Sequence, residues 1–185
     1  MAIAQEKFNH GHVIAQLCLE ISKIDDIRLS IGNSVTRAGY CVYLYKKDRL
    51  IGKFGLFIKS SGKRRSPWNY TFTRDHQSEI DLLFEEYKQV FIVLVNNTDG
   101  VACLSYQLLK QILDDNHEEV EWVSVKSKLS SRYSLSGKDG KLDKKISRSE
   151  FPKAIALYVR SLHRIKDKEE DTKPERGILS RLFGR

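Results

Sequence analysis

Apolar residues recur at helical spacing in four segments of the chain. The periodicity predicts helices over 5–22, 75–88, 106–113 and 151–165, because side chains three and four positions apart share one face of a helix. Polar residues and Gly11 disturb the start of the first segment, so two starts are left open, one at Gln5 and one after the glycine. Residues that favour helix N-caps stand before the other three segments: Thr73, Ser105 and Ser149.

Between the helices lie stretches rich in β-branched and aromatic residues, as is typical of strands. In chain order they are 27–31, 39–45, 50–58, 70–73, 90–95, 101–104, 120–125, 132–136 and 142–146. The run from Val90 to Val95 has no polar alternation, which indicates a central strand covered on both faces. The last two stretches favour a hairpin about 137–140. The pattern predicts one α/β (α+β) domain with a mixed, mostly antiparallel sheet flanked by about four helices.

The domain is expected to span residues 1–165, followed by a flexible, charged and overall basic tail over 166–185. Residues 166–176 are almost all polar or charged and cannot bury enough apolar surface to offset their ordering entropy. The tail ends in apolar residues that fit one face of a short amphipathic helix: Ile178, Leu179, Leu182 and Phe183. That element suits a partner's groove or, more weakly, an anionic membrane surface, and the alternative is that it folds back onto the domain.

Composition favours a soluble, cytoplasmic, folded protein. The chain has 185 residues, 41% of them hydrophobic. Its longest apolar run, 90–95, is far too short for a spanning helix, which needs about 20 residues. Glu6 and Asn9 interrupt the plan of a secretory signal. The three cysteines are widely separated and form no CxxC pair, so they are expected to be reduced, buried and without zinc: Cys18, Cys41 and Cys103.

Charge is segregated along the chain. The formal net charge is +8 overall, and it divides into +8 over 1–74, −9 over 75–125 and +9 over 126–185. Such segregation indicates opposed faces, and a basic face attracts polyanions through steering and counterion release. A protein partner and a plain solvated surface are the alternatives.

The segment 59–74 is the sharpest basic feature. Its cations neutralise phosphates, and its two aromatic rings offer faces on which bases stack. The expected nucleic-acid-binding residues are Lys59, Lys63, Arg64, Arg65, Trp68, Tyr70 and Arg74. The alternative is an exposed loop that Trp68 and Tyr70 anchor to the core. The segment lacks the spacing of a P-loop, so it does not specifically indicate nucleotide phosphates.

Residues for catalysis or metal binding form no recognised pattern. Asp75, His76 and Glu79 share one helix face, and 114–119 is an acidic turn, but neither has a known ligand spacing. Solvated charge is the expected role of both. The chain has no GxSxG motif for a nucleophile. No catalytic residue, metal ligand or cofactor is predicted.

The order of elements over 5–95 resembles the core of the restriction-endonuclease-like PD-(D/E)XK proteins. A helix, a meander of strands, a helix and a hydrophobic strand follow one another in both. In that family a late strand of the meander carries an acid-x-Lys pair. The corresponding residues here are Phe57-Ile58-Lys59, so the lysine matches and Phe57 replaces the acid. The resemblance implies at most a degenerate relative that holds nucleic acid.

The sequence therefore favours a non-enzymatic, cytoplasmic protein that binds nucleic acid or associates with it. Its basic face would be built from the 59–74 loop and from basic residues of 126–148. The first alternative is an adaptor that docks onto a larger complex through its acidic segment and the 178–183 element. The second is a degenerate or atypical nuclease-like protein. The choice between DNA and RNA stays open.

Overall fold

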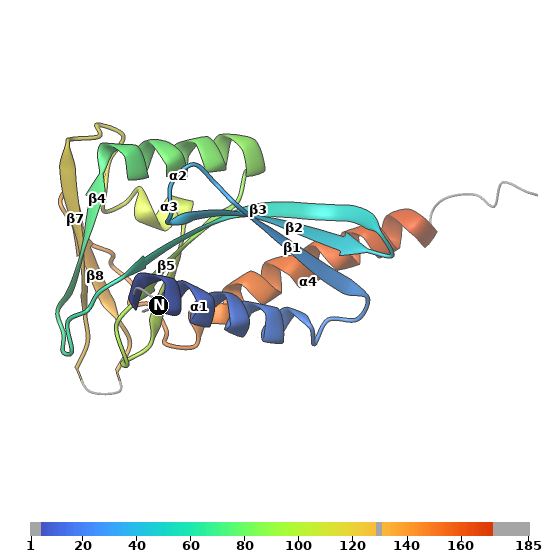
Figure 1. The fold of residues 1–185 in the computed structure, drawn as a ribbon, viewed down its shortest axis with the longest axis horizontal. Helices are drawn as coiled ribbons and strands as arrows, with labels where there is room; N and C mark the ends of the chain where they lie inside the picture. The colour runs from blue at the N-terminus through green and yellow to red at the C-terminus, as the bar shows by residue number, and fades with distance from the viewer. Residues whose placement is uncertain (1–4, 129–130, 172–185) are drawn as a thin grey trace, which may run out of the picture.

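The computed structural model describes residues 5–128 and 131–171, and it has a mixed α/β fold (Figure 1). The predicted fold class is confirmed, but the strands divide into two sheets instead of one. In chain order the described elements are α1 (Gln5–Ile21), β1 (Ile27–Asn33), β2 (Gly39–Lys46), β3 (Arg49–Ser60), β4 (Trp68–Thr73), α2 (Arg74–Tyr87), β5 (Val90–Val95), β6 (Val101–Ser105), α3 (Tyr106–Leu109), β7 (Val120–Lys126), β8 (Ser134–Gly137) and α4 (Glu150–Asp171).

The first sheet has the strand order β1-β2-β3-β5-β6. All its neighbouring strands are antiparallel except β3 and β5, which run parallel from Gly55 opposite Val90 to Ser60 opposite Val95. Every residue of β5 is buried, because its alternate side chains enter two different hydrophobic clusters on the two faces of the sheet. The expected central strand is therefore confirmed.

The second sheet is antiparallel, with the order β4-β7-β8. Together with α2, α3 and one face of the first sheet it encloses a cluster that includes Trp68, Phe72 and Val123. Helices α1 and α4 cover the opposite face of the first sheet, where Val13, Leu17 and Ile155 are buried. Figure 1 shows this arrangement, with the second sheet standing across one end of the molecule.

The structure decides where two of the helices begin: α1 has the earlier of its two possible starts, and α4 begins elsewhere than the pattern predicted. Helix α1 begins at Gln5 and continues through Gly11, because buried His10 and Val13 belong to one continuous apolar face. In α4, Phe151 has extended dihedral angles (φ −94°, ψ 133°), so the regular helix begins at Pro152 and Ser149 is not its cap.

The C-terminal helix and the expected last hairpin also differ from prediction. Helix α4 continues to Asp171, six residues past the boundary expected at 165. The stretches 132–136 and 142–146 do lie antiparallel about 137–140, but 142–146 forms no strand: the pairing consists of isolated bridges from Tyr133 to Ile146 and from Ser136 to Lys141. The expected partner-binding residues lie outside the described part of the chain: Ile178, Leu179, Leu182 and Phe183. None of the helices described is long and apolar enough to cross a membrane.

Candidate nucleic-acid interface

The loop between β3 and β4 presents three adjacent cations to solvent. Lys63, Arg64 and Arg65 are exposed, and within the described residues their side chains have no ion-pair partner. The loop backbone is nevertheless fixed. Trp68 donates its indole N–H to the carbonyl oxygen of Lys63 (2.9 Å), and the Asn97 amide donates to that of Gly62 (3.0 Å). The loop therefore holds its cations at a defined place.

The two aromatic residues of the segment are buried and do not present stacking faces. Trp68 and Tyr70 are each 2% exposed. The Tyr70 hydroxyl donates to Asn96 Oδ1 (2.5 Å), and Trp68 meets the ring of Tyr133 edge-on. The expectation that these rings stack on bases is wrong. They anchor the loop to the core, which was the alternative interpretation.

A basic groove of about 440 Å³ lies beside this loop. Ser66 and Pro67 of the loop line one side, and the region 126–145 supplies the remaining residues. Five lining residues are cations: Lys126, Lys128, Arg132, Lys141 and Lys145. Five others are serines: Ser66, Ser127, Ser131, Ser134 and Ser136. No acidic side chain lines it, and none of the five cations forms an ion pair within the described residues.

Hydrogen bonds and an ion pair join the segments that surround the groove. The Ser127 amide donates to Ser66 Oγ (3.0 Å), which joins the end of β7 to the β3–β4 loop. Arg148 forms an ion pair with Asp99 (2.8 Å) and donates to the Ser131 carbonyl oxygen (2.8 Å). The side chain of Arg148 is thus used in contacts within the fold, whereas the five cations that line the groove form no such ion pairs in the described structure.

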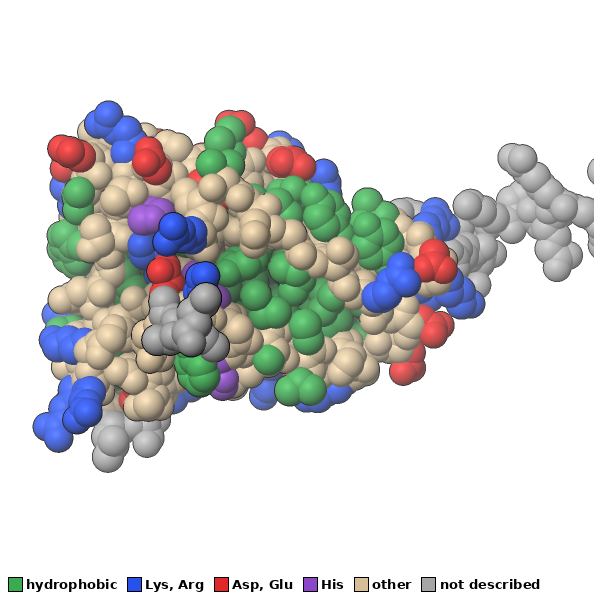
Figure 2. All heavy atoms as spheres, in the orientation of Figure 1, with side chains coloured by type: hydrophobic (Ala, Val, Ile, Leu, Met, Phe, Trp, Pro, Cys, Tyr) green, Lys and Arg blue, Asp and Glu red, His purple; other side chains and the backbone are tan. Residues whose placement is uncertain are grey.

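The charges separate along the second sheet. In Figure 2, basic side chains project at the lower left, where Figure 1 places the β3–β4 loop and the end of β7. Acidic side chains stand at the upper left, at the opposite end of the same sheet, together with some basic ones. The basic groove is therefore well placed to bind a polyanion away from the acidic turn.

Arg74 lies at the acidic end of this sheet. Strand β4 separates it from the loop, since Trp68 pairs with Val125 and Thr73 with Val120. Five residue steps at about 3.3 Å each place these two ends about 17 Å apart. Arg74 Nε donates to the carbonyl oxygen of His117 (3.3 Å) in the acidic turn. Arg74 is therefore not part of the basic patch, contrary to expectation.

Lys59 does not line the basic groove but lies beside His76 at the start of α2. Its half-buried ammonium is 3.4 Å from His76 Nδ1 and lies near the ring of Phe72. Burial lowers the pKa of Lys59, and the negative charge of Glu6 opposes that effect. A half-buried lysine that faces a histidine is poorly placed to contact a phosphate backbone, so Lys59 also stands apart from the groove.

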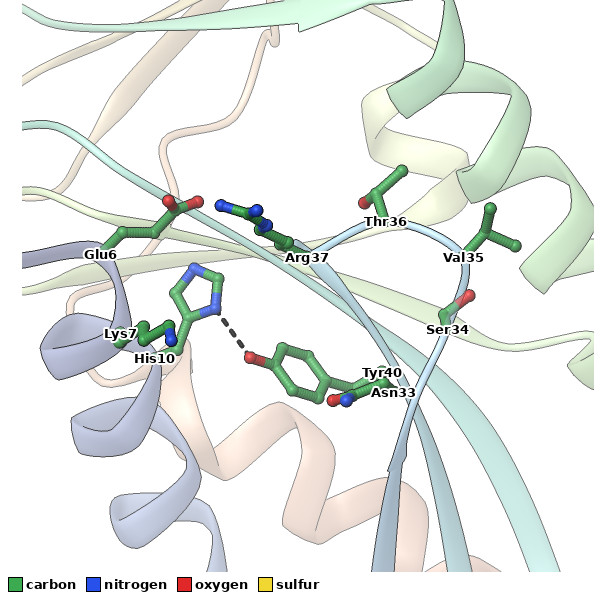
Figure 3. Close-up of a pocket in the computed structure, with 9 residues that line it drawn as sticks. All are labelled: Glu6, Lys7, His10, Asn33, Ser34, Val35, Thr36, Arg37 and Tyr40. Carbon is green, nitrogen blue, oxygen red and sulfur yellow. Dashed lines mark hydrogen bonds between the residues drawn. The ribbon is translucent and has the colours of Figure 1, made fainter. Parts of the chain in front are cut away.

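A pocket of about 340 Å³ lies between α1 and the β1–β2 loop, and the charge of Glu6, one of its lining residues, acts on Lys59. Figure 3 shows its lining, with His10 Nδ1 2.8 Å from the Tyr40 hydroxyl and the side chains of Glu6 and Arg37 nearby. Burial lowers the pKa of His10; the negative charge of Glu6 opposes that effect, and the positive charge of Lys59 adds to it. The geometry therefore favours a neutral imidazole in this pocket at neutral pH.

The helix face that was expected to carry solvated charge is partly buried. Glu79 is buried and accepts hydrogen bonds from the amide and hydroxyl of Thr36, the amide at 2.8 Å. His76 Nδ1 accepts from the Thr73 amide (3.1 Å) and completes the capping box of α2. Both side chains fix local structure, so the expectation of solvated charge is wrong for Glu79.

The order of elements that the PD-(D/E)XK resemblance implies is present, but the acid-x-Lys pair is not. Phe57, in the position of the acid, is fully buried and stacks with Phe72. The negative charge of Glu6 acts on Lys59 from another element, α1, and no acid precedes the lysine by two residues in β3.

No known protein family matches this chain, and no curated protein or solved structure matches it either. The function must therefore be argued from the geometry. The sequence located the three loop cations and the basic character of 126–148. It could not tell which residues of that region line a common groove.

Proposed function

We propose that this protein binds nucleic acid through the groove between the β3–β4 loop and residues 126–145. The observation that carries the proposal is the lining itself, which among the described residues has five cations without an ion pair and no acidic side chain. Surfaces that serve solubility alone intersperse both signs of charge. A concave surface of one sign raises the local concentration of the opposite charge.

The chemistry of the lining favours the phosphate backbone over the bases. Lysine and arginine neutralise phosphates, and serine hydroxyls donate to phosphate oxygens. The aromatic rings of the adjoining segment, Trp68 and Tyr70, are buried and cannot stack. We therefore infer binding that depends weakly on sequence and strongly on salt.

The exposed cations of the loop extend the same surface. Lys63, Arg64 and Arg65 stand next to Ser66, which lines the groove and is bonded to Ser127. A strand that enters the groove would meet these three cations at its rim. The loop is already fixed by Trp68, so little ordering entropy opposes binding.

The test is the salt dependence of binding, measured by fluorescence anisotropy with short labelled single-stranded DNA, single-stranded RNA and duplex DNA. The groove variant combines Lys126→Ala, Lys141→Ala and Lys145→Ala. The rim variant combines Lys63→Ala, Arg64→Ala and Arg65→Ala. A matched control removes three exposed cations of α4 by Lys153→Ala, Arg160→Ala and Arg164→Ala.

Each phosphate contact contributes about 0.9 to the slope of log K against log salt on duplex DNA and about 0.7 on single strands. The groove and rim variants should each flatten the slope by up to about 3 units on duplex DNA. The control should leave it nearly unchanged although its net charge falls equally. Absence of salt-dependent binding by the full chain would reject the proposal. An equal loss in all three variants would reject the groove as the site.

A further inference from the structure

Three carboxylates converge at the end of the second sheet opposite the basic groove. Asp114 follows α3, Glu121 is the second residue of β7, and Asp139 lies in the turn after β8. One oxygen from each carboxylate lies within 4.8 Å of the other two. The spacing along the chain gave no sign of this cluster, because Asp139 is remote from the other two in sequence.

The central member of the cluster is buried and only half satisfied. Glu121 is 1% exposed. One of its oxygens, Oε1, accepts a hydrogen bond from the Glu118 amide (2.9 Å), whereas Oε2 is buried and has no partner in the described residues. An unpartnered buried carboxylate oxygen is costly, and two further carboxylates beside it add repulsion. This arrangement of oxygens favours a bound positive charge.

The nearby lysines are bound to other acids. Lys138 pairs with Glu118, and Lys110 pairs with Asp81 (3.2 Å) and Asp115 (2.8 Å). Neither of these two ammonium groups makes an ion pair with Glu121 in the described structure. The charge of Lys138 also acts on Asp139 and Glu121, so it compensates the cluster in part. No lysine of the described residues is bonded to the unpartnered oxygen of Glu121, which leaves room for a further positive charge.

The backbone around the cluster is already fixed. The Asp114 amide donates to Asp139 Oδ2 (3.1 Å), and the Asp139 amide donates to the Ile112 carbonyl oxygen (3.1 Å). These bonds hold the acidic turn and the 137–140 turn together, so two of the three carboxylates are positioned by their own backbones. A preorganised set of oxygens is a feature of sites for hard cations.

We propose that Asp114, Glu121 and Asp139 form a binding site for a divalent cation of the calcium type. Carboxylate oxygens are the ligands that hard cations prefer. Calcium fits best, because Asp114 and Asp139 are exposed and leave room for the water ligands that complete its larger, flexible shell. The bound ion would tie the acidic turn to the 137–140 turn. It would stand at the opposite end of β7 from the groove, so its role is structural.

The test uses the full chain stripped of metal with a chelator. Calcium binding is measured by isothermal titration up to about 10 mM, above the dissociation constants of about 0.1–1 mM of weak calcium sites. Terbium is a second probe, since Trp122 next to Glu121 can sensitise its luminescence. Thermal unfolding is recorded with and without calcium. The variants are Glu121→Gln and Asp139→Asn, and the control is Asp143→Asn, an exposed acid outside the cluster.

The proposal predicts one saturable calcium per wild-type chain and a rise in melting temperature with calcium, since a ligand that binds only the folded state stabilises it. Asp143→Asn should keep both, and the two cluster variants should lose both. If Glu121→Gln fails to fold, exposed Asp139 still provides the decisive variant. Absence of binding, or equal binding in all variants, would overturn the site. Stabilisation of the wild type by mild acid but not by calcium would show that the carboxylates share a proton instead.

Discussion

The two ends of the second sheet are both highly charged, but they use their charges differently. At the acidic end, Lys110 joins Asp81 and Asp115, His117 lies 3.0 Å from Asp81, and Lys138 pairs with Glu118. At the basic end, the five lining cations of the groove have no such partner in the described structure. The charges of the acidic end pair mainly with one another, whereas the lining cations of the basic end are left unpaired in the described structure and can contact a ligand.

The difference shows how segregated charge in a sequence should be interpreted. Segments 75–125 and 126–185 carry formal charges of the same size and opposite sign. Net charge alone therefore cannot rank them as binding surfaces. Ion pairing within the fold does rank the two surfaces. A charged side chain that already has a partner must give up that ion pair before it binds a ligand, whereas an unpaired side chain loses nothing. The exception at the acidic end is Glu121, and its unpartnered oxygen led to the proposed cation site.

The largest effect is expected from the tryptophan that anchors the basic end. Trp68→Ala removes a buried ring and the indole bond to Lys63, and it should cost about 3–5 kcal/mol of unfolding free energy. Trp122→Ala, on the neighbouring strand and 47% exposed, should cost less than about 1 kcal/mol. Denaturant unfolding of both variants measures the contrast. Equal losses would show that Trp68 is no special anchor of the loop.

Two lysine variants compare a lysine that is ion-paired within the fold with a lysine that lines the groove. Lys110→Ala removes a largely buried ammonium with two carboxylate partners and should destabilise the protein by about 1–2 kcal/mol. Lys141→Ala, in the groove, should change stability by less than about 0.5 kcal/mol because its side chain is exposed and unpaired. Chemical denaturation supplies both values. A cost for Lys141→Ala as large as that for Lys110→Ala would erase the distinction between the two ends.

A smaller effect is the dependence of stability on pH, which should come from two histidines outside the groove and the ion pairs of the acidic end, His10 and His76. Burial lowers the pKa of His10 and of His76 below the ordinary value near 6.5. The unfolded chain therefore takes up these protons first, so stability is retained above about pH 6.5 and falls as the pH drops below it. His10→Gln should reduce the loss of stability between about pH 7.5 and pH 5.5, which spans that ordinary pKa. The control is His12→Gln on the exposed side of α1. A pH response that is the same in both variants and the wild type would contradict this origin.

The sequence predicted best the features that depend on local pattern. Val90–Val95 was identified as a covered strand because no polar residue interrupts it. The contiguous cations Lys63, Arg64 and Arg65 were identified as an exposed basic loop. The two sheets were not predicted, because the pairing of β4 with β7 joins segments about 50 residues apart that carry no shared local signal.

The errors in the predicted site have a specific cause. Trp68, Tyr70 and Phe72 alternate with exposed residues along β4, so they share the buried face of that strand. That alternation could have shown that the rings point inward. Arg74 is close to the loop in sequence, but an extended strand carries it to the other end of the sheet. Glu121 and Asp139 meet only through tertiary folding, which no spacing rule reveals.

The most direct test of the account is the footprint of a bound oligonucleotide on the full chain. Hydrogen–deuterium exchange, measured by mass spectrometry with and without a short single-stranded oligonucleotide, reports which backbone segments are covered. Binding in the groove predicts slower exchange over 61–67, 126–136 and 141–145, and unchanged exchange over 110–121 and 137–140 at the acidic end of the same sheet. Protection at the acidic end, or no protection at the groove under conditions where the oligonucleotide binds, would contradict it.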